Sequence, residues 1–200
     1  QNIISLMSSS KPVIAQKAIT AFYHICLRYP NALPMGFATL KSKLDDSDQS
    51  IVFAALTVLS ELCEHNPSNC VKLIPKLHGM LGNISNNWIT MRVIYLLRNL
   101  CSVEPRLIKK LIAPLSNILE TTSSVTLLFE CIRTIIEVPI TNSVMMSAAA
   151  QRLQNMLENQ DPNLRYLCIQ LYMKMMEVQP KLVAQNKELI SECLDSNDDR

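Results

Sequence analysis

Histidine and paired carboxylates are the side chains of this 200-residue sequence that could support acid–base catalysis or bind a metal. The three histidines, far apart in the chain, are His24, His65 and His78. Glu64 precedes His65 directly, and neighbouring residues on a helix do not face each other. Paired carboxylates occur in polar segments, at Asp45-Asp46 and Asp198-Asp199, where no apolar surroundings would shift a pKa. This distribution favours solvated or capping side chains, so we expect no enzyme and no catalytic residue.

Seven cysteines could form disulfides or bind a metal, but the sequence contains no CxxC pair. Five lie inside strongly apolar stretches, namely Cys26, Cys63, Cys101, Cys131 and Cys168. Free cysteine behaves as a small buried hydrophobe, which predicts reduced core thiols in a cytosolic protein. Gly79 and Gly82 fall where a helix should end and suit a helix cap, because no strand precedes them and no phosphate-binding GK[ST] motif occurs. We therefore expect neither a metal nor a cofactor.

A ladder of leucines organises the whole chain. Each leucine ends an apolar segment just before a short polar run, and the ladder consists of Leu6, Leu44, Leu81, Leu119, Leu157 and Leu194. The spacings are 38, 37, 38, 38 and 37 residues. A period of this length is typical of stacked helical hairpins. The ladder predicts about five repeats, at approximately 8–44, 45–81, 82–119, 120–157 and 158–194.

Each repeat divides into two helices, because most repeats contain a second break at a proline such as Pro30 or Pro67. The predicted first helices are 11–29, 49–65, 87–103, 124–138 and 162–178, and the predicted second helices are 31–44, 68–81, 106–120, 144–157 and 181–194. Pro75 and Pro114 fall inside second helices, where they predict a kink or a late start. The fourth repeat departs from the pattern, since Pro139 should end its first helix and 141–147 should form an irregular linker.

Composition agrees with an all-α protein. Hydrophobic residues make up 48% and aromatic residues 5% of the sequence, a mixture that suits helical stacks better than sandwiches or barrels. The pattern as a whole predicts a right-handed α-solenoid, a single segment spanning 1–200 that we expect to be part of a longer protein. The longest apolar run, 51–59, has nine residues if Thr57 is counted and is too short to cross a bilayer. The net charge of +2 does not favour a nucleic-acid partner.

The densest basic cluster is Arg106, Lys109 and Lys110. Arg106 and Lys110 are four residues apart, so the three side chains share one face of the predicted helix 106–120. Solvated faces of this kind keep a solenoid soluble, and that interpretation stays open. The alternative hypothesis is contact with a charged partner or an anionic membrane surface.

Several segments resemble the trunk of the large adaptin subunits. They are Asn86-Asn87-Trp88-Ile89, Val103-Glu104-Pro105-Arg106-Leu107, Lys109-Lys110-Leu111-Ile112, Leu127-Leu128-Phe129-Glu130-Cys131 and Asp161-Pro162-Asn163-Leu164-Arg165-Tyr166-Leu167. The run from Glu104 to Cys131 is most similar to the delta-adaptins of the third adaptor-protein complex. The resemblance extends over essentially the whole chain, although no basic motif matches the lipid-binding residues of related subunits.

The resemblance implies a HEAT/armadillo-like trunk within a cytosolic heterotetramer. Its expected partners are beta, mu and sigma adaptin-type subunits and an Arf-type small GTPase, with peripheral association on Golgi or endosomal membranes. The function so implied is a structural scaffold in intracellular protein transport. The alternative is a HEAT-repeat scaffold of another class, such as a karyopherin or a phosphatase regulatory subunit.

Overall fold

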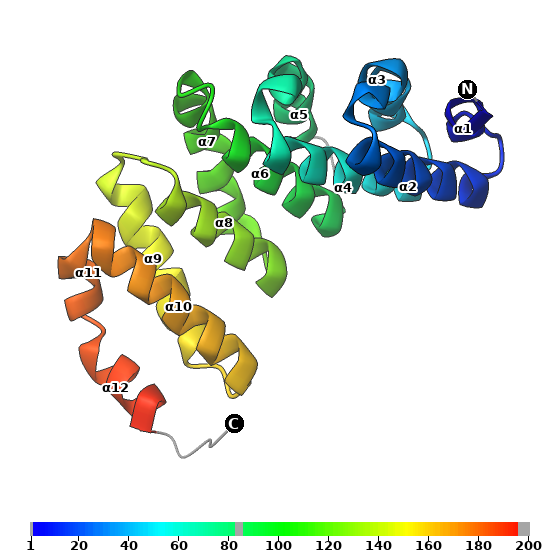
Figure 1. The fold of residues 1–200 in the computed structure, drawn as a ribbon. Coiled ribbons are helices and arrows are strands. Elements are labelled where there is room, and N and C mark those ends of the chain that lie inside the picture. Colours follow the sequence, from blue (N-terminus) through cyan, green and yellow to red (C-terminus); the bar gives the residue numbers. More distant parts are fainter. Residues whose placement is uncertain (1, 83–85, 196–200) are drawn as a thin grey trace. The chain divides into compact units, whose positions relative to one another are not determined.

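Helices form the regular structure of this protein. The computed structural model describes residues 2–82 and 86–195, with side chains up to residue 193. Within these ranges the secondary structure consists of α-helices and 3-10 helices without strands, as Figure 1 shows. The all-α prediction is therefore confirmed. The chain forms two compact units, Gln1–Leu107 and Ile108–Arg200, and each is described by itself.

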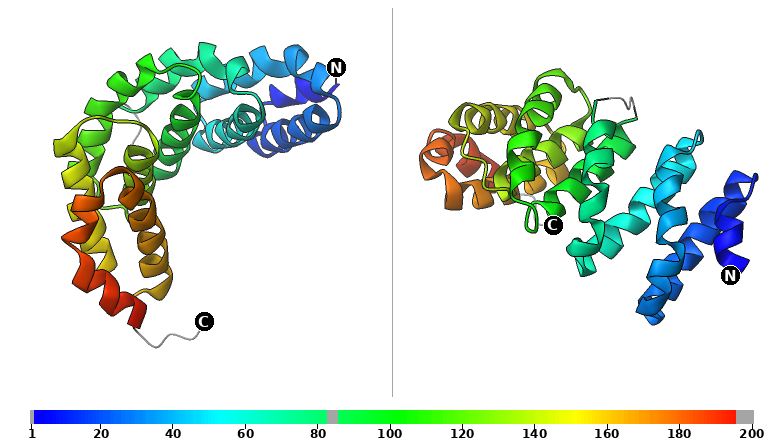
Figure 2. Two further views of the ribbon diagram at one scale, coloured as in Figure 1. Left: turned by 60° about the vertical axis from the view of Figure 1, so that its left-hand side comes forward. Right: turned by 90° about the horizontal axis from the view of Figure 1, so that it is seen from above.

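The first unit contains three long helices that lie side by side. These are α2 (Pro12–Arg28), α4 (Gln49–His65) and α6 (Asn87–Leu100), and α4 packs against both of the others (Figure 1 and Figure 2). Between them the chain forms η1 (Pro30–Ala32), α3 (Leu33–Ser42), η2 (Lys43–Asp45), η3 (Pro67–Leu73) and α5 (Ile74–Met80). A short helix, α1 (Asn2–Met7), packs on α2. The alternation of long and interrupted helices is the predicted hairpin pattern.

The second unit also consists of helices that pack as hairpins. Its elements are most of α7 (Arg106–Thr121), then α8 (Val125–Glu137), α9 (Ser143–Leu157), α10 (Pro162–Val178), α11 (Pro180–Ala184) and α12 (Lys187–Asp195). Helix α8 packs against α9 and α10, and α10 packs against α9 and α11. Contacts therefore join helices of one hairpin or of adjacent hairpins, as in an α-solenoid. The division into five repeats stays a prediction.

Most predicted first helices agree closely with the structure. Helices α4 and α10 have the predicted bounds, and α2 and α8 differ by one residue at each end. Helix α6 ends at Leu100 instead of residue 103, and a turn follows it. Good agreement follows from clear start signals, since the side chain of Asp161 accepts a hydrogen bond from the backbone N–H of Asn163 at 2.9 Å, with Pro162 at the first helical position.

Prolines explain why the second helices of the first unit are interrupted. Pro75 is the second residue of α5, and the seven residues before α5 form the 3-10 helix η3. Proline has no N–H and its ring clashes with the carbonyl four residues earlier, which disfavours an α-helix that runs through this position from residue 68. The late start predicted for Pro75 is confirmed. Pro34 occupies the same place in α3 after η1, whereas Pro114 lies inside the continuous helix α7.

Three expectations from the sequence were wrong. The linker expected at 141–147 is shorter, because Asn142 caps α9 by accepting a hydrogen bond from the N–H of Met145 at 3.1 Å. Gly79 lies inside α5, and neither it nor Gly82 has the positive φ of a glycine helix cap. Leu6 is 46% exposed, because α1 packs on α2 through Met7, which is fully buried.

The other ladder leucines within the described side chains belong to the core. Leu44, Leu81, Leu119 and Leu157 have exposed fractions of 5%, 9%, 3% and 0%. The side chain of Leu194 lies outside the described residues. The same holds for 83–85, in the polar run after Leu81, and for 196–199, in the polar run after Leu194. An apolar stripe of α7 at helical spacing is also buried, since Leu107, Leu111, Leu115 and Ile118 are all at most 8% exposed.

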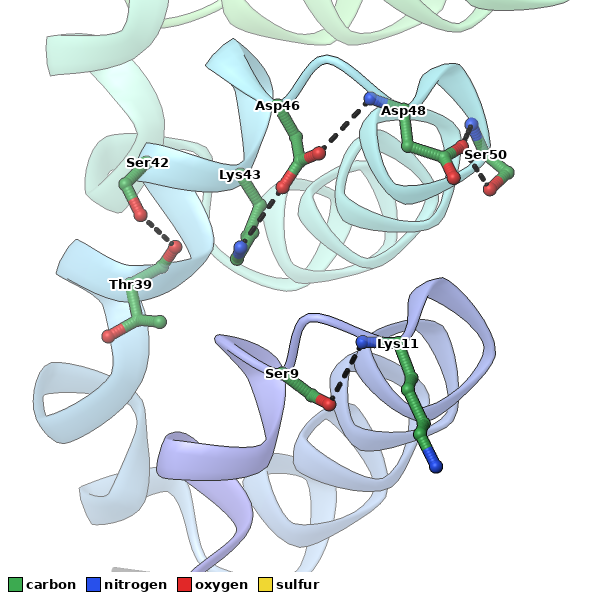
Figure 3. A network of polar contacts seen from close by, with 8 residues as sticks. All are labelled: Ser9, Lys11, Thr39, Ser42, Lys43, Asp46, Asp48 and Ser50. Atoms are coloured by element: carbon green, nitrogen blue, oxygen red, sulfur yellow. Dashed lines mark hydrogen bonds and ion pairs between the residues drawn. The ribbon is translucent and has the colours of Figure 1, made fainter.

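A polar network holds the loop between the first two hairpins (Figure 3). The carboxylate of Asp46 accepts hydrogen bonds from Lys43 at 3.0 Å and from the backbone N–H of Asp48 at 3.1 Å. Asp48 then caps α4 by accepting a hydrogen bond from the N–H of Ser50 at 2.8 Å. The pKa of Asp46 is held below its ordinary value, first by the hydrogen bond from the backbone N–H of Asp48 and second by the hydrogen bond from Lys43. The acidic residues of this loop therefore position helices.

Candidate partner-binding surface

The histidines are not assembled into a catalytic or metal site. His24 and His65 are exposed and His78 is half-buried. The ring of His24 lies 5.5 Å from that of Tyr23, a stacking neighbour and not an acid–base partner. In residues 2–82 and 86–195, no group of three or more His, Cys, Asp and Glu side chains is placed to hold a metal ion.

Most cysteines lie inside the helical stack, and the described residues contain no disulfide. Six are buried and Cys193 is half-buried. Burial raises the pKa of Cys101 to about 11 and those of Cys131 and Cys168 to about 12, so these thiols stay protonated and unreactive at neutral pH. The hydrogen bond between Cys63 and Cys70 raises the pKa of Cys63. The arrangement is that of packed core residues.

The basic cluster predicted at 106–110 lies on α7. Arg106, Lys109 and Lys110 are all exposed, and the buried side chains of Leu107 and Leu111 occupy the opposite face of the same helix. We call these three basic residues the α7 cluster. Their exposed positions on one helix face suit contact with an anionic partner.

The remaining basic residues of the second helices divide into two groups. Lys43 pairs with Asp46 at 3.0 Å, Lys76 pairs with Asp45, and Arg152 donates to backbone carbonyls of α7. Lys41 and Lys72 are exposed and form no ion pair with any described residue. The first group therefore stabilises the fold, and the second group is open to solvent.

An apolar groove between Lys41 and Lys72 is the feature that the sequence reasoning missed. The groove has a volume of about 480 Å³ and runs along α3, whose Pro34, Phe37 and Ala38 contribute to its lining. We call it the α3 groove. A signal was available, because the stretch 30–41 carries apolar residues on more of its circumference than the single stripe that a half-buried helix needs.

None of the helices in the described part of the chain is long and apolar enough to span a bilayer. The α7 cluster and the α3 groove are two candidate contact sites on the described surface.

Comparison with known proteins identifies similar chains. The family model described as the adaptin N terminal region matches residues 1–200. The AP-3 complex subunit delta-1 of Bos taurus is 38% identical over 205 residues, which cover 99% of this chain and 17% of that protein. The AP-3 complex subunit delta of Dictyostelium discoideum is 38% identical over 198 residues, which cover 98% of this chain and 17% of the relative.

A structural comparison gives the same result. A chain in a homology model of the full-length AP-3 complex in an intermediate open conformation matches with a TM-score of 0.80 and 34% identity, over 97% of this chain and 34% of that one. The α-solenoid architecture predicted from the leucine ladder is thereby confirmed. With a family model matched along its entire length, the chain belongs to the adaptin N-terminal region family.

Proposed function

We propose that this chain is a structural scaffold segment of the large subunit of a vesicle-coat adaptor complex. Its match to the adaptin family over residues 1–200 is the observation that carries the proposal. The 38% identity to AP-3 delta subunits favours a complex of that type. Because the chain spans 17% of the length of these relatives, it supplies one part of a longer scaffold. Its role is to hold partners, without enzyme activity of its own.

The proposed partners are beta, mu and sigma adaptin-type subunits, with an Arf-type small GTPase supporting recruitment. Within such a complex the chain would associate peripherally with Golgi or endosomal membranes and take part in protein transport toward the lysosome or vacuole. The stacked helices support this proposal, because a solenoid presents an extended surface to several partners at once.

Co-purification tests the proposal. A tagged form of the full-length protein that contains this chain should recover beta-, mu- and sigma-type adaptin subunits in equal amounts. Recovery of a phosphatase catalytic subunit, or of nuclear transport cargo, would instead identify a HEAT-repeat scaffold of another class. Both family and structural similarity favour the adaptor complex over that alternative.

We propose further that the α7 cluster contacts an anionic surface of a partner or a membrane. The exposure of Arg106, Lys109 and Lys110 on one helix supports the contact. Replacing all three by Glu in the full-length protein should reduce either subunit co-purification or membrane recruitment, and the affected readout identifies the surface. The matched control changes the exposed Lys181 and Lys187 to Glu. Unchanged co-purification and recruitment would show that the α7 cluster is only a solvated face.

A further inference from the structure

The α3 groove is an apolar surface left uncovered within the first unit. Its lining residues on α3 and the preceding turn recur at helical spacing, from Pro30 through Pro34 and Ala38 to Lys41. Pro34 and Ala38 are exposed, and Phe37 is half-buried. Three turns of the chain therefore present an apolar strip to solvent, on a helix whose opposite side is buried through Gly36 and Leu40.

The groove exists because neighbouring second helices pack less closely than neighbouring first helices. Helices α2, α4 and α6 pack on one another, whereas α3 packs chiefly on α1, α2 and its flanking 3-10 turns. The opposite wall comes from η3, which contributes Asn69 and Lys72. Since Pro75 delays α5 until Ile74, the segment facing the groove is a 3-10 helix and not a full α-helix. The proline pattern of the sequence thus determines where the groove lies.

Two positive charges border this apolar strip. Lys41 stands on the α3 wall and Lys72 on the η3 wall, and both are exposed. Neither forms an ion pair with a described residue, while Lys43 of η2 and Lys76 of α5 pair with Asp46 and Asp45. The eight lining residues of the groove include no carboxylate. A complementary ligand therefore combines apolar side chains with negative charge.

We propose that the α3 groove binds an acidic amphipathic helix of a partner protein. The strip from Pro30 to Lys41 is about 16 Å long, the length of about three turns of an α-helix. A helix inserted in a groove places its i, i+3, i+4 and i+7 side chains on the apolar floor and its polar residues at the rim. Its carboxylates would meet Lys41 and Lys72. A flat bilayer surface fits less well, because the apolar floor lies between two walls.

The proposal does not depend on the adaptor-complex assignment, since it concerns a surface of the folded chain. It is tested by selecting peptides from a display library of 16-residue helix-forming sequences on the immobilised 200-residue chain. Ala38→Trp, which fills the groove at an exposed position, serves for counter-selection. The selected peptides should carry apolar residues at helical spacing together with Asp or Glu. Their affinity, measured by fluorescence anisotropy, should fall at least tenfold with Lys41→Glu/Lys72→Glu.

The matched control is Lys181→Glu/Lys187→Glu, which makes the same charge change at two exposed lysines of α11 and α12. It should alter the affinity less than twofold, and the helical circular dichroism signal should show that all variants stay folded. The proposal is overturned if no selected peptide distinguishes the parent from Ala38→Trp, or if the selected peptides are indifferent to Lys41→Glu/Lys72→Glu. Binding to vesicles of phosphatidylcholine and phosphatidylserine through these lysines, without peptide binding, would also overturn it and identify a membrane contact.

Discussion

The Nε atom of Arg152 on α9 lies 2.9 Å from the carbonyl oxygen of Leu119 near the end of α7. The same guanidinium donates to the carbonyl oxygen of Thr122 at 3.2 Å. The last carbonyls of a helix have no partner within the helix and carry its negative dipole end, so this cation caps α7 from the next hairpin. The side chain of Arg152 therefore links α9 to the end of α7 by hydrogen bonds.

Arg152→Met should destabilise the chain by about 1–2 kcal/mol, because the side-chain stem is kept but the charged hydrogen bonds are lost. Urea denaturation followed by circular dichroism measures the change. Gln151→Met, at the exposed neighbouring position, is the control and should change the free energy of unfolding by less than about 0.5 kcal/mol. Equal stability of the two variants would contradict the capping role.

The two helical glycines of the first unit should respond to alanine in opposite ways. A Cβ atom at Gly36 would clash with the ring of Phe22, whose side chain is only 2% exposed and has little room to shift. Gly36→Ala should therefore cost about 1–3 kcal/mol through overpacking. At Gly79 no atom lies within 4 Å of the added Cβ, so Gly79→Ala should stabilise α5 by up to about 1 kcal/mol. Thermal unfolding of both variants shows whether the melting temperature falls with Gly36→Ala and rises with Gly79→Ala.

Leu81→Asp should destabilise the chain by at least about 3 kcal/mol, because it places a charge at a core position that is 9% exposed. Val144→Asp is the matched control, since Val144 is 77% exposed in the first turn of α9, where a negative charge is tolerated. Differential scanning calorimetry compares their melting temperatures. A Leu81→Asp variant that melts like the parent would show that this ladder leucine contributes little to the core.

The loop carboxylate of Asp46 should make stability depend on pH. Its pKa is lowered in the folded state, first by the hydrogen bond from the N–H of Asp48 and then by Lys43, so its stabilisation is complete above about pH 4 and is lost as the pH falls through the folded pKa. Asp46→Asn should be less stable than the parent at pH 7, and the difference should shrink as the pH approaches about 2.

Urea midpoints at both pH values test this, with Glu120→Gln as the control for loss of one exposed charge. A difference between Asp46→Asn and the parent that grows on acidification would reverse the sign of the linkage and refute the assignment of the stabilising charge.

The first helices could be predicted from the sequence because their signals are local. Asp161 with Pro162, and Asp48 before α4, mark helix starts through hydrogen bonds that reach only two residues along the chain. Among the second helices, the late start at Pro75 was predicted, but the 3-10 segments that precede α3 and α5 were not. The residue at which each α-helix begins depends on the length of the 3-10 segment before the proline, and the periodic pattern of apolar residues does not specify this length.

The candidate surfaces were only partly predictable for a different reason. The α7 cluster is local, and its exposure follows from the buried stripe on the same helix. Lys43 pairs locally with Asp46, but the roles of Lys76 and Arg152 depend on partners that lie 30 or more residues away in the chain, such as Asp45 for Lys76. A count of basic residues on the second helices cannot distinguish these roles, because the residues look alike in a helical pattern.

The polar bonds between hairpins span one repeat at a time. Asn86 donates to Gln49 at 2.8 Å, and Lys174 pairs with Glu137, each across 37 residues. The element pairs in extensive contact likewise belong to one hairpin or to adjacent hairpins. Such a chain has low contact order, which favours fast folding. Folding can nucleate at any pair of hairpins and propagate to the neighbouring hairpins. When the chain is pulled from its two ends, the hairpins should therefore unfold one after another. The force–extension curve should show several small unfolding steps instead of one cooperative transition.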